Sequence, residues 1–339
     1  MAIRSTLPAG PLGFGTAPLG NMYRNISEGE ASATVEAAWE AGIRFFDTAP
    51  FYGAGLSEVR LGKALKNYPR DEYVIATKVG RLVLPELVDT SKRTFGDKGN
   101  IFKNGNANAI RYDYTAEGTK RSIADSLERL GIDRLDYVFI HDLAQDFHGD
   151  AWISKFEEAQ HGAFPVLDQL LDDGVIGAWG QGTNKVEPIE IGLELKEPRA
   201  NGMLLAGRYT ILDHESALQR LMPLATTKNV DVIVGGPYNS GALVGGEHFE
   251  YGPIPPEVAD RVSRITALCE KHGVPIKAAA LQFSLAHPAV AAVVPGSSKP
   301  SRIAEDVAAL NFDVPAAFWG ALRSSGVVAE AAPLPVDTF

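Results

Sequence analysis

The sequence GIRFFDTAPFYG, residues 42–53, holds the strongest clue to the architecture of this chain. Its first half contains a short run of mainly β-branched and aromatic residues at 43–46, which is typical of a buried strand. The run ends at the carboxylate of Asp47, and the phenol of Tyr52 follows within a turn that contains proline and glycine. The pattern predicts a strand whose end presents polar side chains at the edge of a sheet.

Two later segments have the same form. Lys78 closes the apolar run at residues 73–78, and His141 follows the run at residues 135–140. Taken singly, a capping aspartate, a loop-edge tyrosine, a solvated lysine and a hydrogen-bonded histidine are ordinary structural residues. At the ends of successive strands, however, a carboxylate, a phenol, an ammonium and an imidazole suit proton transfer. We call Asp47, Tyr52, Lys78 and His141 the quartet and predict that they are catalytic.

Strand and helix patterns alternate along the whole chain. Strands are expected at residues 12–16, 43–46, 73–78, 135–140, 175–179, 202–206, 230–234 and 291–294. Helices are expected at residues 28–42, 57–68, 115–131, 162–174, 187–197, 215–229, 256–273 and 301–310. This alternation predicts an α/β protein, a (β/α)8 TIM barrel that forms a single domain over residues 1–339.

An open doubly wound sheet is the main alternative architecture. Such a sheet usually carries a glycine-rich dinucleotide fingerprint after its first strand. The opening segment offers only Gly13 and Gly15, because Pro18 stands where the third glycine would allow helix packing. The barrel is therefore the favoured architecture.

Two long connections follow predicted strands. Residues 89–108 and 245–256 are rich in turn-forming residues, and each segment lies between a strand and a helix. In a barrel, such loops lie over the face where the strand carboxyl ends converge. Tyr23, Phe51 and Trp152 also fall in loops at this rim, where aromatic rings suit the wall of a small-molecule pocket. Packing within the loops would explain these three residues equally well.

The quartet has a simple chemical logic. A free phenol has a pKa of about 10 and is a poor acid or base at neutral pH. An ammonium from Lys78 beside Tyr52 would lower the pKa of the phenol, and Asp47 would hold the lysine in place. His141, as a neutral imidazole, would orient the substrate oxygen. These groups suit reversible proton transfer to a carbonyl or hemiacetal oxygen.

Composition narrows the classes of partner. The chain has 339 residues, 45% apolar and 22% charged, and a net charge of −10, which disfavours nucleic acid and anionic membranes. A single cysteine, Cys269, cannot form an internal disulfide, and the first residues lack the apolar segment of a signal peptide. No apolar run approaches the ~20 residues of a membrane span. The histidines outside the quartet show no metal-ligand spacing. We expect a cytoplasmic protein without a metal.

The residues around the quartet resemble the aldo-keto reductase family. The similarity rests on residues 41–65, which look like the family signature around its aspartate and tyrosine, on TKV at 77–79 and on IHD at 140–142. The resemblance implies a (β/α)8 barrel, a nicotinamide cofactor, and Tyr52 as the general acid/base assisted by the other three residues. The hydride half of the reaction comes from this resemblance.

The same resemblance suggests which residues bind NAD or NADP. In WGQGTNKVEP, Asn184 stands where the family holds the nicotinamide carboxamide, with Gly182 in place of a serine. In GGPYNSGAL, Gly235 stands where many members stack a tyrosine on the nicotinamide. Gly296 stands where many NADPH-preferring members have lysine, which slightly favours NAD. The expected cofactor contacts are Asn184, Arg208, Tyr238, Asn239, Ser240, Gly241, Gly296, Ser297, Ser298, Arg302, Glu305 and Asp306.

Several segments resemble one branch of the family. AGRYTILDH at 206–214, GGPYNSG at 235–241 and HDLAQDFHGD at 141–150 are similar to the dehydrogenases of L-fucose, D-threo-aldoses and pyridoxal. That branch oxidises a cyclic hemiacetal to a lactone. The resemblance therefore implies a small-molecule substrate of this kind. It leaves the oligomeric state open.

Two alternatives remain. The first is an NADPH-dependent reductase of small aldehydes that uses the same quartet in the opposite direction. The second is a cofactor-sensing regulatory subunit, since the family includes barrels that regulate a membrane partner. The presence of all four reactive groups favours an enzyme.

Overall fold

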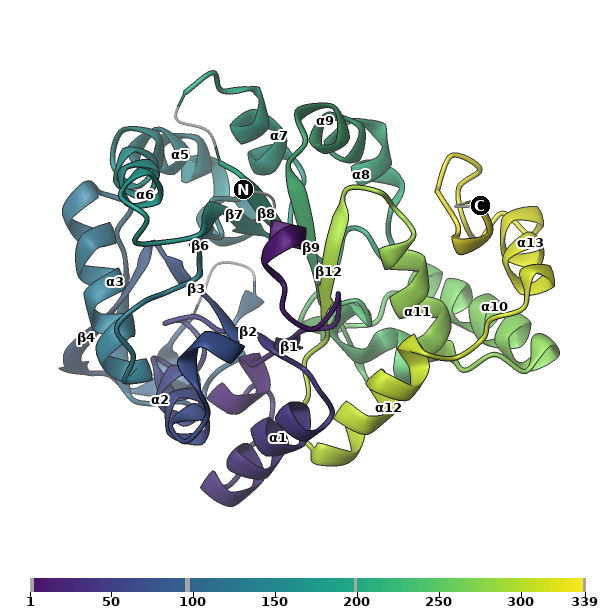
Figure 1. Ribbon diagram of the computed structural model, residues 1–339, viewed down its shortest axis with the longest axis horizontal. Coiled ribbons are helices and arrows are strands. Elements are labelled where there is room, and N and C mark those ends of the chain that lie inside the picture. The colour runs from purple at the N-terminus through teal and green to yellow at the C-terminus, as the bar shows by residue number, and fades with distance from the viewer. Residues whose placement is uncertain (1–2, 95–97, 198–199, 338–339) are drawn as a thin grey trace.

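Eight parallel strands form one sheet that curls into a barrel with helices around it (Figure 1). The structure is a computed structural model, and it describes residues 3–94, 98–197 and 200–337. The strands follow the order β1-β2-β3-β6-β7-β8-β9-β12, and parallel bridges from Leu12 to Val293 and from Gly15 to Gly296 bring the first strand to the last. Their bounds are β1 Phe14–Gly15, β2 Phe45–Asp47, β3 Val74–Val79, β6 Tyr137–His141, β7 Ala178–Thr183, β8 Gly202–Ala206, β9 Asp231–Gly235 and β12 Val290–Val294. The predicted barrel is confirmed.

One helix packs outside each strand and completes the repeated unit. The eight outer helices are α1 Glu28–Glu40, α2 Leu56–Leu65, α3 Ala116–Leu130, α6 Ala163–Asp172, α7 Glu187–Glu194, α9 Leu221–Lys228, α11 Ile276–Leu285 and α12 Pro300–Leu310. Local signals set the ends of several of them. Helix α1 begins at a reciprocal capping box of Ser27 and Glu30, and helix α3 ends at Gly131 with φ 66°.

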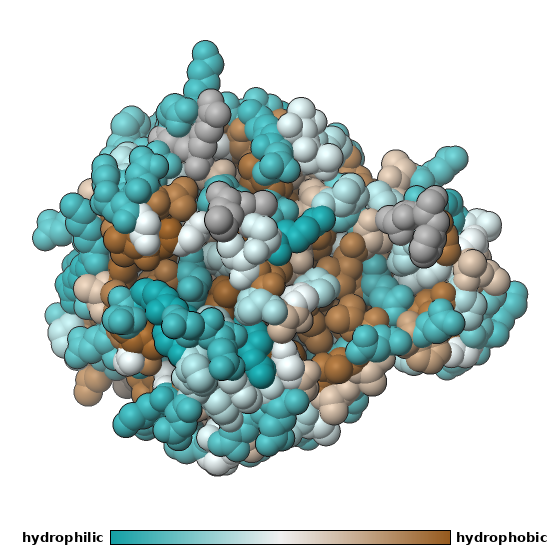
Figure 2. Space-filling model, viewed as in Figure 1, coloured by the Kyte–Doolittle hydropathy of each residue, from teal (hydrophilic) through white to brown (hydrophobic). Residues whose placement is uncertain are grey.

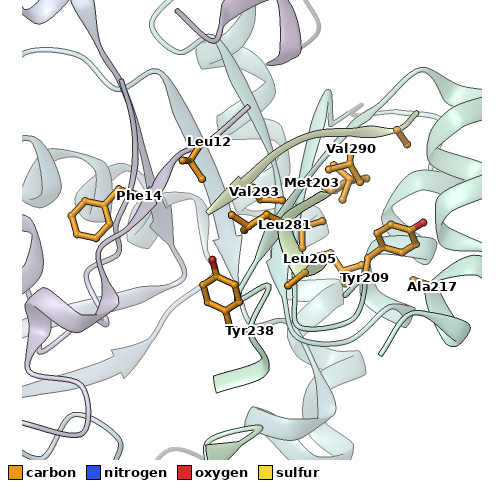
Figure 3. Close-up of a cluster of buried hydrophobic side chains, with 14 of the residues drawn as sticks. Leu12, Phe14, Met203, Leu205, Tyr209, Ala217, Tyr238, Leu281, Val290 and Val293 are labelled. Atoms are coloured by element: carbon orange, nitrogen blue, oxygen red, sulfur yellow. The ribbon is translucent and has the colours of Figure 1, made fainter. Parts of the chain in front are cut away.

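Alternating side chains divide the apolar core into two layers. Leu204 of β8 points into the barrel, where it belongs to the same cluster as Phe139. Its neighbours Met203 and Leu205 belong to the outer layer beneath the helices. Figure 3 shows a part of that outer layer, in which these two side chains and Val293 lie beside Leu281 of α11. The barrel interior is therefore filled with side chains, and only its rim is open to a substrate.

The amino-terminal segment covers one end of the barrel. Ile3, in a 3-10 turn at Ile3–Thr6, is buried in the interior cluster with Tyr137. Arg4 donates hydrogen bonds to the carbonyl oxygens of Pro288 and Val290. These contacts close the end where the strands begin, so the opposite rim is the end available for chemistry.

Two antiparallel hairpins rise from the barrel. Strands β4 Arg81–Leu87 and β5 Asn108–Tyr112 follow β3, and strands β10 His248–Phe249 and β11 Gly252–Pro253 follow β9. The two long loops expected from the sequence are parts of these hairpins, although residues 95–97 lie outside the described residues. Both hairpins contribute side chains to the cavity above the barrel, as expected for loops over the active face.

Some boundaries and elements differ from the sequence predictions. The fifth strand runs Ala178–Thr183 instead of 175–179, because the chain first turns at Gly174, where φ is 70°. The helix expected at 215–229 divides into α8 Glu215–Gln219 and α9, with a break at Arg220 that the nearby Pro223 explains. Helix α11 was missed because it is apolar on most faces, which hides its period. Further helices are α4 Gln145–His148, α5 Trp152–His161, α10 Pro256–His272 and α13 Ala316–Ser324.

The surface is mixed in character. On the face shown in Figure 2, hydrophilic residues cover most of the helices and hydrophobic residues show in the furrows between them. Within the described ranges, none of the helices has the length and apolarity needed to cross a membrane. The same residues contain no group of three or more histidine, cysteine, aspartate or glutamate side chains arranged to hold a metal ion.

Candidate active site

The quartet converges at the carboxyl ends of three adjacent strands. Asp47 ends β2, Lys78 lies near the end of β3 and His141 ends β6. Tyr52 stands in the turn between β2 and α2, where the following Gly53 has φ 67° and packs directly against the backbone of Gly20. A side chain at that glycine would displace the turn, so the placement of Tyr52 depends on it.

The Lys78 ammonium is the centre of the group. It donates hydrogen bonds to both carboxylate oxygens of Asp47 at 2.8 Å and to the Thr48 carbonyl at 2.9 Å. It also lies 3.1 Å from the hydroxyl of Tyr52. The ion pair is almost fully buried, because the two side chains are only 2% and 5% exposed. The arrangement holds the ammonium against the phenol, as the sequence predicted.

The pKa of Tyr52 shifts in the direction opposite to the prediction. Burial raises the pKa of the phenol well above its usual value, and the carboxylates of Asp47 and Asp142 raise it further. Lys78 does not reverse this shift, because both oxygens of Asp47 already balance its charge. Tyr52 is therefore a neutral phenol near pH 7, a form that can donate a proton.

His141 lines the same cavity as Tyr52, and its imidazole is neutral. Burial lowers the pKa of the imidazole well below its usual value, and the positive charges of Arg81 and Lys78 add to the shift. Its ring centroid lies 5.9 Å from that of Tyr52. Its Nε2 lies 3.3 Å from Oδ2 of Asp142, and its Nδ1 is buried without a hydrogen-bond partner among the described residues.

Both polar and apolar side chains line the first cavity. Tyr52, Lys78, His141, Asp142 and Asn184 supply polar groups. The apolar lining includes Met22, Phe51, Ile101, Phe102 and Phe147. A small molecule bound here would have its reacting oxygen near the quartet and its apolar surface against the aromatic rings.

Of the three aromatic residues proposed as substrate contacts, the structure brings only Phe51 into the lining of this cavity. Tyr23 lies outside that lining and stacks on His248, with ring centroids 4.4 Å apart. Trp152 opens helix α5 instead of standing in a rim loop, and it also lies outside the lining. The stacking on His248 accounts for the position of Tyr23.

A second cavity adjoins the first. Asn184, Ala206 and Tyr251 line both cavities, so Tyr251 of the β10–β11 connection stands at their junction. The remaining lining residues are Lys98, Gly207, Arg208, Gly236, Asn239, Ser240 and Glu250. Two cations, amide and hydroxyl groups and an open glycine position at Gly236 make this a suitable lining for a nucleotide diphosphate.

The loop after β9 has the shape of an anion-binding turn. Ser240 and Gly241 have φ angles of 58° and 100°. Asn239 is fixed by a hydrogen bond from its amide to the Gly207 carbonyl at 3.1 Å and by one from the Thr210 hydroxyl at 2.7 Å. Arg208 pairs with Asp213 at 3.0 Å and with Glu250. The contacts expected at Asn184, Arg208, Asn239 and Ser240 therefore gather around one cavity.

The expected contacts after β12 divide into two groups. Gly296, Arg302 and Glu305 are exposed. The carbonyl oxygen of Ser298 accepts a hydrogen bond from Arg24 at 2.9 Å. Ser297 is buried, and its hydroxyl donates to the Lys299 carbonyl at 2.9 Å. This turn opens helix α12, and its hydroxyls at Ser297 and Ser298 are buried, so the groups open to a ribose or phosphate are those of Gly296, Arg302 and Glu305.

Tyr238 and Asp306 form an internal brace. The Tyr238 hydroxyl donates to Oδ1 of Asp306 at 2.7 Å, and Lys277 donates to the same oxygen at 2.7 Å. Lys277 also pairs with Glu305 at 2.9 Å. Both Tyr238 and Asp306 are buried, so their polar groups are used between the loop after β9 and helix α12.

Gly235 leaves the barrel rim open at the position of the expected stacking tyrosine. A Cβ atom there would lie 3.3 Å from Ala206 and from Leu204, so a side chain would crowd the rim. Gly182 likewise lines the first cavity without a side chain. Gly235 lies outside the lining of both cavities, and the aromatic ring at the junction of the cavities is that of Tyr251.

Sequence reasoning missed Arg81, Lys98, Asp142 and Tyr251. A signal existed for two of them, because Asp142 follows His141 directly and Arg81 follows Lys78 by three residues. Polar residues just beyond a strand end reach the same rim as the last residue of the strand. Lys98 and Tyr251 come from hairpins, and no local pattern indicates which cavity they enter.

Comparison with known proteins agrees with this geometry. A model described as "Aldo/keto reductase family" matches residues 11–326, so the chain belongs to the aldo/keto reductase family. The chain is similar to D-threo-aldose 1-dehydrogenase from a Pseudomonas species, with 37% identity over 94% of each chain. It is also similar to pyridoxal 4-dehydrogenase from Microbacterium luteolum, with 36% identity over 96% of each chain. The holo form of an aldo-keto reductase from Bacillus halodurans has a TM-score of 0.66, 25% identity and 97% coverage of both chains. The family is one of oxidoreductases and implies a nicotinamide cofactor and small carbonyl substrates.

Proposed function

We propose that this protein is an NAD(P)-dependent dehydrogenase that oxidises the cyclic hemiacetal of an aldose, of the L-fucose or D-threo-aldose type, or of pyridoxal to a lactone. One observation carries the proposal: the Lys78 ammonium lies between the Asp47 carboxylate and the Tyr52 hydroxyl at the rim of the barrel. The names of the two relatives at 37% and 36% identity support the choice of substrate class.

Each member of the quartet has a part in this reaction. For oxidation Tyr52 must first be a phenolate, which the adjacent Lys78 ammonium stabilises. The phenolate then accepts the proton of the anomeric hydroxyl and becomes a neutral phenol. Neutral His141 bonds to the same substrate oxygen or to its neighbour and fixes the orientation. Asp47 holds Lys78 in place. The buried surroundings exclude water from the reacting carbon.

The lining of the second cavity fits a nicotinamide dinucleotide. When bound, this cofactor supplies the hydride acceptor. Asn184 would hold the carboxamide at the junction of the two cavities, and Arg208, Asn239, Ser240 and Gly241 would bind the diphosphate. Ser297, Ser298, Arg302 and Glu305 would approach the adenosine from the turn before α12. Gly182 in the lining of the first cavity and Tyr251 at the junction would adjoin the nicotinamide ring.

A panel of hemiacetals tests this proposal. We expect lactone formation from L-fucose, D-arabinose or pyridoxal with NAD⁺ or NADP⁺, followed by cofactor absorbance and by chromatography of the lactone. The ratio of the rates with the two cofactors also measures the cofactor preference. Absence of turnover with all three substrates at saturating cofactor would reject the substrate assignment.

The protonation state of Tyr52 favours a second candidate. A neutral phenol is the form needed to donate a proton to a carbonyl oxygen, as in the reduction of a small aldehyde by NADH or NADPH. Measuring both directions with the same preparation separates the two candidates. Faster reduction than oxidation at neutral pH, for every substrate pair tested, would favour the reductase.

A further inference from the structure

Asp142 is a charged group in the first cavity to which the quartet assigns no role. It directly follows His141, lines the cavity and is only 4% exposed. Its φ of 52° is in the left-handed region, which non-glycine residues seldom occupy and which collects at functional sites. Its backbone N–H donates to the Gly182 carbonyl at 2.9 Å, which fixes this conformation at the barrel rim.

Arg81 holds this carboxylate in the cavity. Its Nη2 donates to Oδ2 of Asp142. Its guanidinium carbon lies 3.8 Å from the ring centroid of Phe51 and 4.4 Å from that of Phe147. Within the described ranges, its Nε and Nη1 are buried without a hydrogen-bond partner. The aromatic rings fix the Arg81 guanidinium, and its hydrogen bond in turn fixes the position of the Asp142 carboxylate.

Stability does not explain this buried pair. Removing two charges from water costs more than their attraction returns in many proteins, and an apolar pair of similar volume is often as stable. The pair also stands among Phe51, Phe102 and Phe147, where apolar side chains would pack readily. The position of the carboxylate beside the reacting groups offers a functional reason for its presence.

We propose that Asp142 determines specificity by accepting a hydrogen bond from a substrate hydroxyl next to the reacting carbon. This inference rests on the proposed function for the choice of an aldose, and extends it to hydroxylated aldehydes in general. Burial raises the pKa of Asp142 to about 7, and the ionised form above that pH only accepts hydrogen bonds, so it selects a hydroxyl that donates. Because His141 Nε2 lies 3.3 Å from the same carboxylate, a substrate held by Asp142 places its reacting oxygen within reach of the imidazole. The aromatic side chains that also line the cavity would receive the C–H surface of the substrate.

Three-carbon aldehydes test the inference. Glyceraldehyde carries hydroxyls on both carbons beyond its carbonyl, 2-hydroxypropanal carries only the one next to the carbonyl, and propanal carries none. The two hydroxylated aldehydes should respond alike. For Asp142→Asn, we expect the ratio of kcat/KM for glyceraldehyde to that for propanal to fall about 10- to 100-fold relative to the unmodified protein, because a hydrogen bond to a charged acceptor is lost. Thermal unfolding of each protein is measured in parallel.

Strand β6 offers a matched control. Asp136 pairs with Arg70 at 2.6 Å just before the other end of the same strand, outside both described cavities. Asp136→Asn should leave the glyceraldehyde-to-propanal ratio unchanged. If Asp142→Asn does not fold, the double variant Arg81→Met/Asp142→Asn removes both buried charges and should show the same loss of ratio.

The outcomes distinguish this inference from the proposed function. An equal loss of activity toward glyceraldehyde and propanal would overturn the inference, because it would show that Asp142 acts only by positioning His141. A changed ratio with no hemiacetal oxidation by the unmodified protein would support the inference and reject the aldose assignment. If Asp142→Asn loses aldose oxidation and also changes the glyceraldehyde-to-propanal ratio, the result supports both the inference and the proposed function.

Discussion

Two arginine–aspartate pairs flank strand β6, Arg70–Asp136 before it and Arg81–Asp142 after it. Arg70 also donates to the carbonyls of Tyr73 and Arg134, and Asp136 accepts from a backbone N–H of β3. These bonds tie neighbouring backbone segments together. The side chains of this pair are 15% and 22% exposed, so water reaches them.

The pair after the strand is built differently. The side chains of Arg81 and Asp142 are 1% and 5% exposed, and the carboxylate faces the cavity that holds Tyr52. The same two residue types therefore fasten the backbone at one end of a strand and present a charge to a substrate at the other. In a barrel, this difference follows from the position of the site at the carboxyl ends of the strands.

The largest expected effect comes from removing a hydroxyl at the carboxyl end. Tyr52→Phe deletes the proton-transferring group and should lower kcat by about 10²- to 10⁴-fold in steady-state assays, with little change in the melting temperature. Tyr137→Phe is the control, because its hydroxyl bonds to Thr6 at the closed end of the barrel. A Tyr137→Phe variant as inactive as Tyr52→Phe would remove the functional distinction between the two ends.

A large effect on stability is expected from Arg81. Burial raises the pKa of Asp142 to about 7 and Arg81 opposes that rise, so Arg81→Met leaves a buried carboxyl that takes up a proton at neutral pH. Loss of its charged hydrogen bond should lower the free energy of unfolding by about 3 kcal/mol. Arg70→Met removes hydrogen bonds from a partly exposed pair and should cost about 1–2 kcal/mol. Urea unfolding at neutral pH measures both. Equal losses would contradict the difference in burial between the pairs.

The pH dependence of oxidation gives an intermediate effect. Burial and nearby carboxylates raise the pKa of Tyr52, so the phenolate needed for oxidation becomes more abundant as the pH rises, and kcat/KM should increase up to about tenfold per pH unit. Asp142→Asn removes a negative charge that raises this pKa, so the rise should begin at lower pH. The carboxylate of Asp136 is not among the groups that shift Tyr52, and Asp136→Asn should keep the original profile. A profile in Asp142→Asn that coincides with that of the unmodified protein would argue against this coupling.

Salt should give the smallest effect. The Debye length falls to about 3 Å at 1 M ionic strength, so partly exposed pairs are screened more than buried ones. The stability cost of Asp136→Asn should fall by up to about 0.5 kcal/mol between low and high NaCl. The cost of Asp142→Asn should change less. Urea titrations at low and at high NaCl measure both costs. If the cost of Asp142→Asn fell more than the cost of Asp136→Asn, the pair after the strand would be the more accessible one.

Much of the architecture was predictable from local patterns. The runs ending at Asp47, Lys78 and His141 marked three strand ends, and a parallel barrel brings such ends together. Boundaries were less predictable where a turn intervenes, as at Gly174, or where a helix is apolar on most faces, as in α11. These segments lack a periodic contrast between buried and exposed residues.

The candidate site was predictable in part. Phe51 lines the cavity as expected, but Trp152 begins a helix and Tyr23 packs on His248. Arg81 and Asp142 lie 61 residues apart in sequence, and nothing local to either one indicates that they pair. Such a pair depends on which loops close over the barrel, which is a property of the whole chain.

The sequence by itself determined the alternation of strands and helices and the chemical types at the strand ends, because short-range periodicity encodes both. The tertiary structure decided which charges are buried and which partners they have. It therefore decided that Tyr52 has a raised pKa despite the adjacent Lys78, and that Asp142 presents a carboxylate to the cavity while Asp136 fastens the backbone. Desolvation and ion pairing depend on segments distant in sequence, so local patterns cannot specify them.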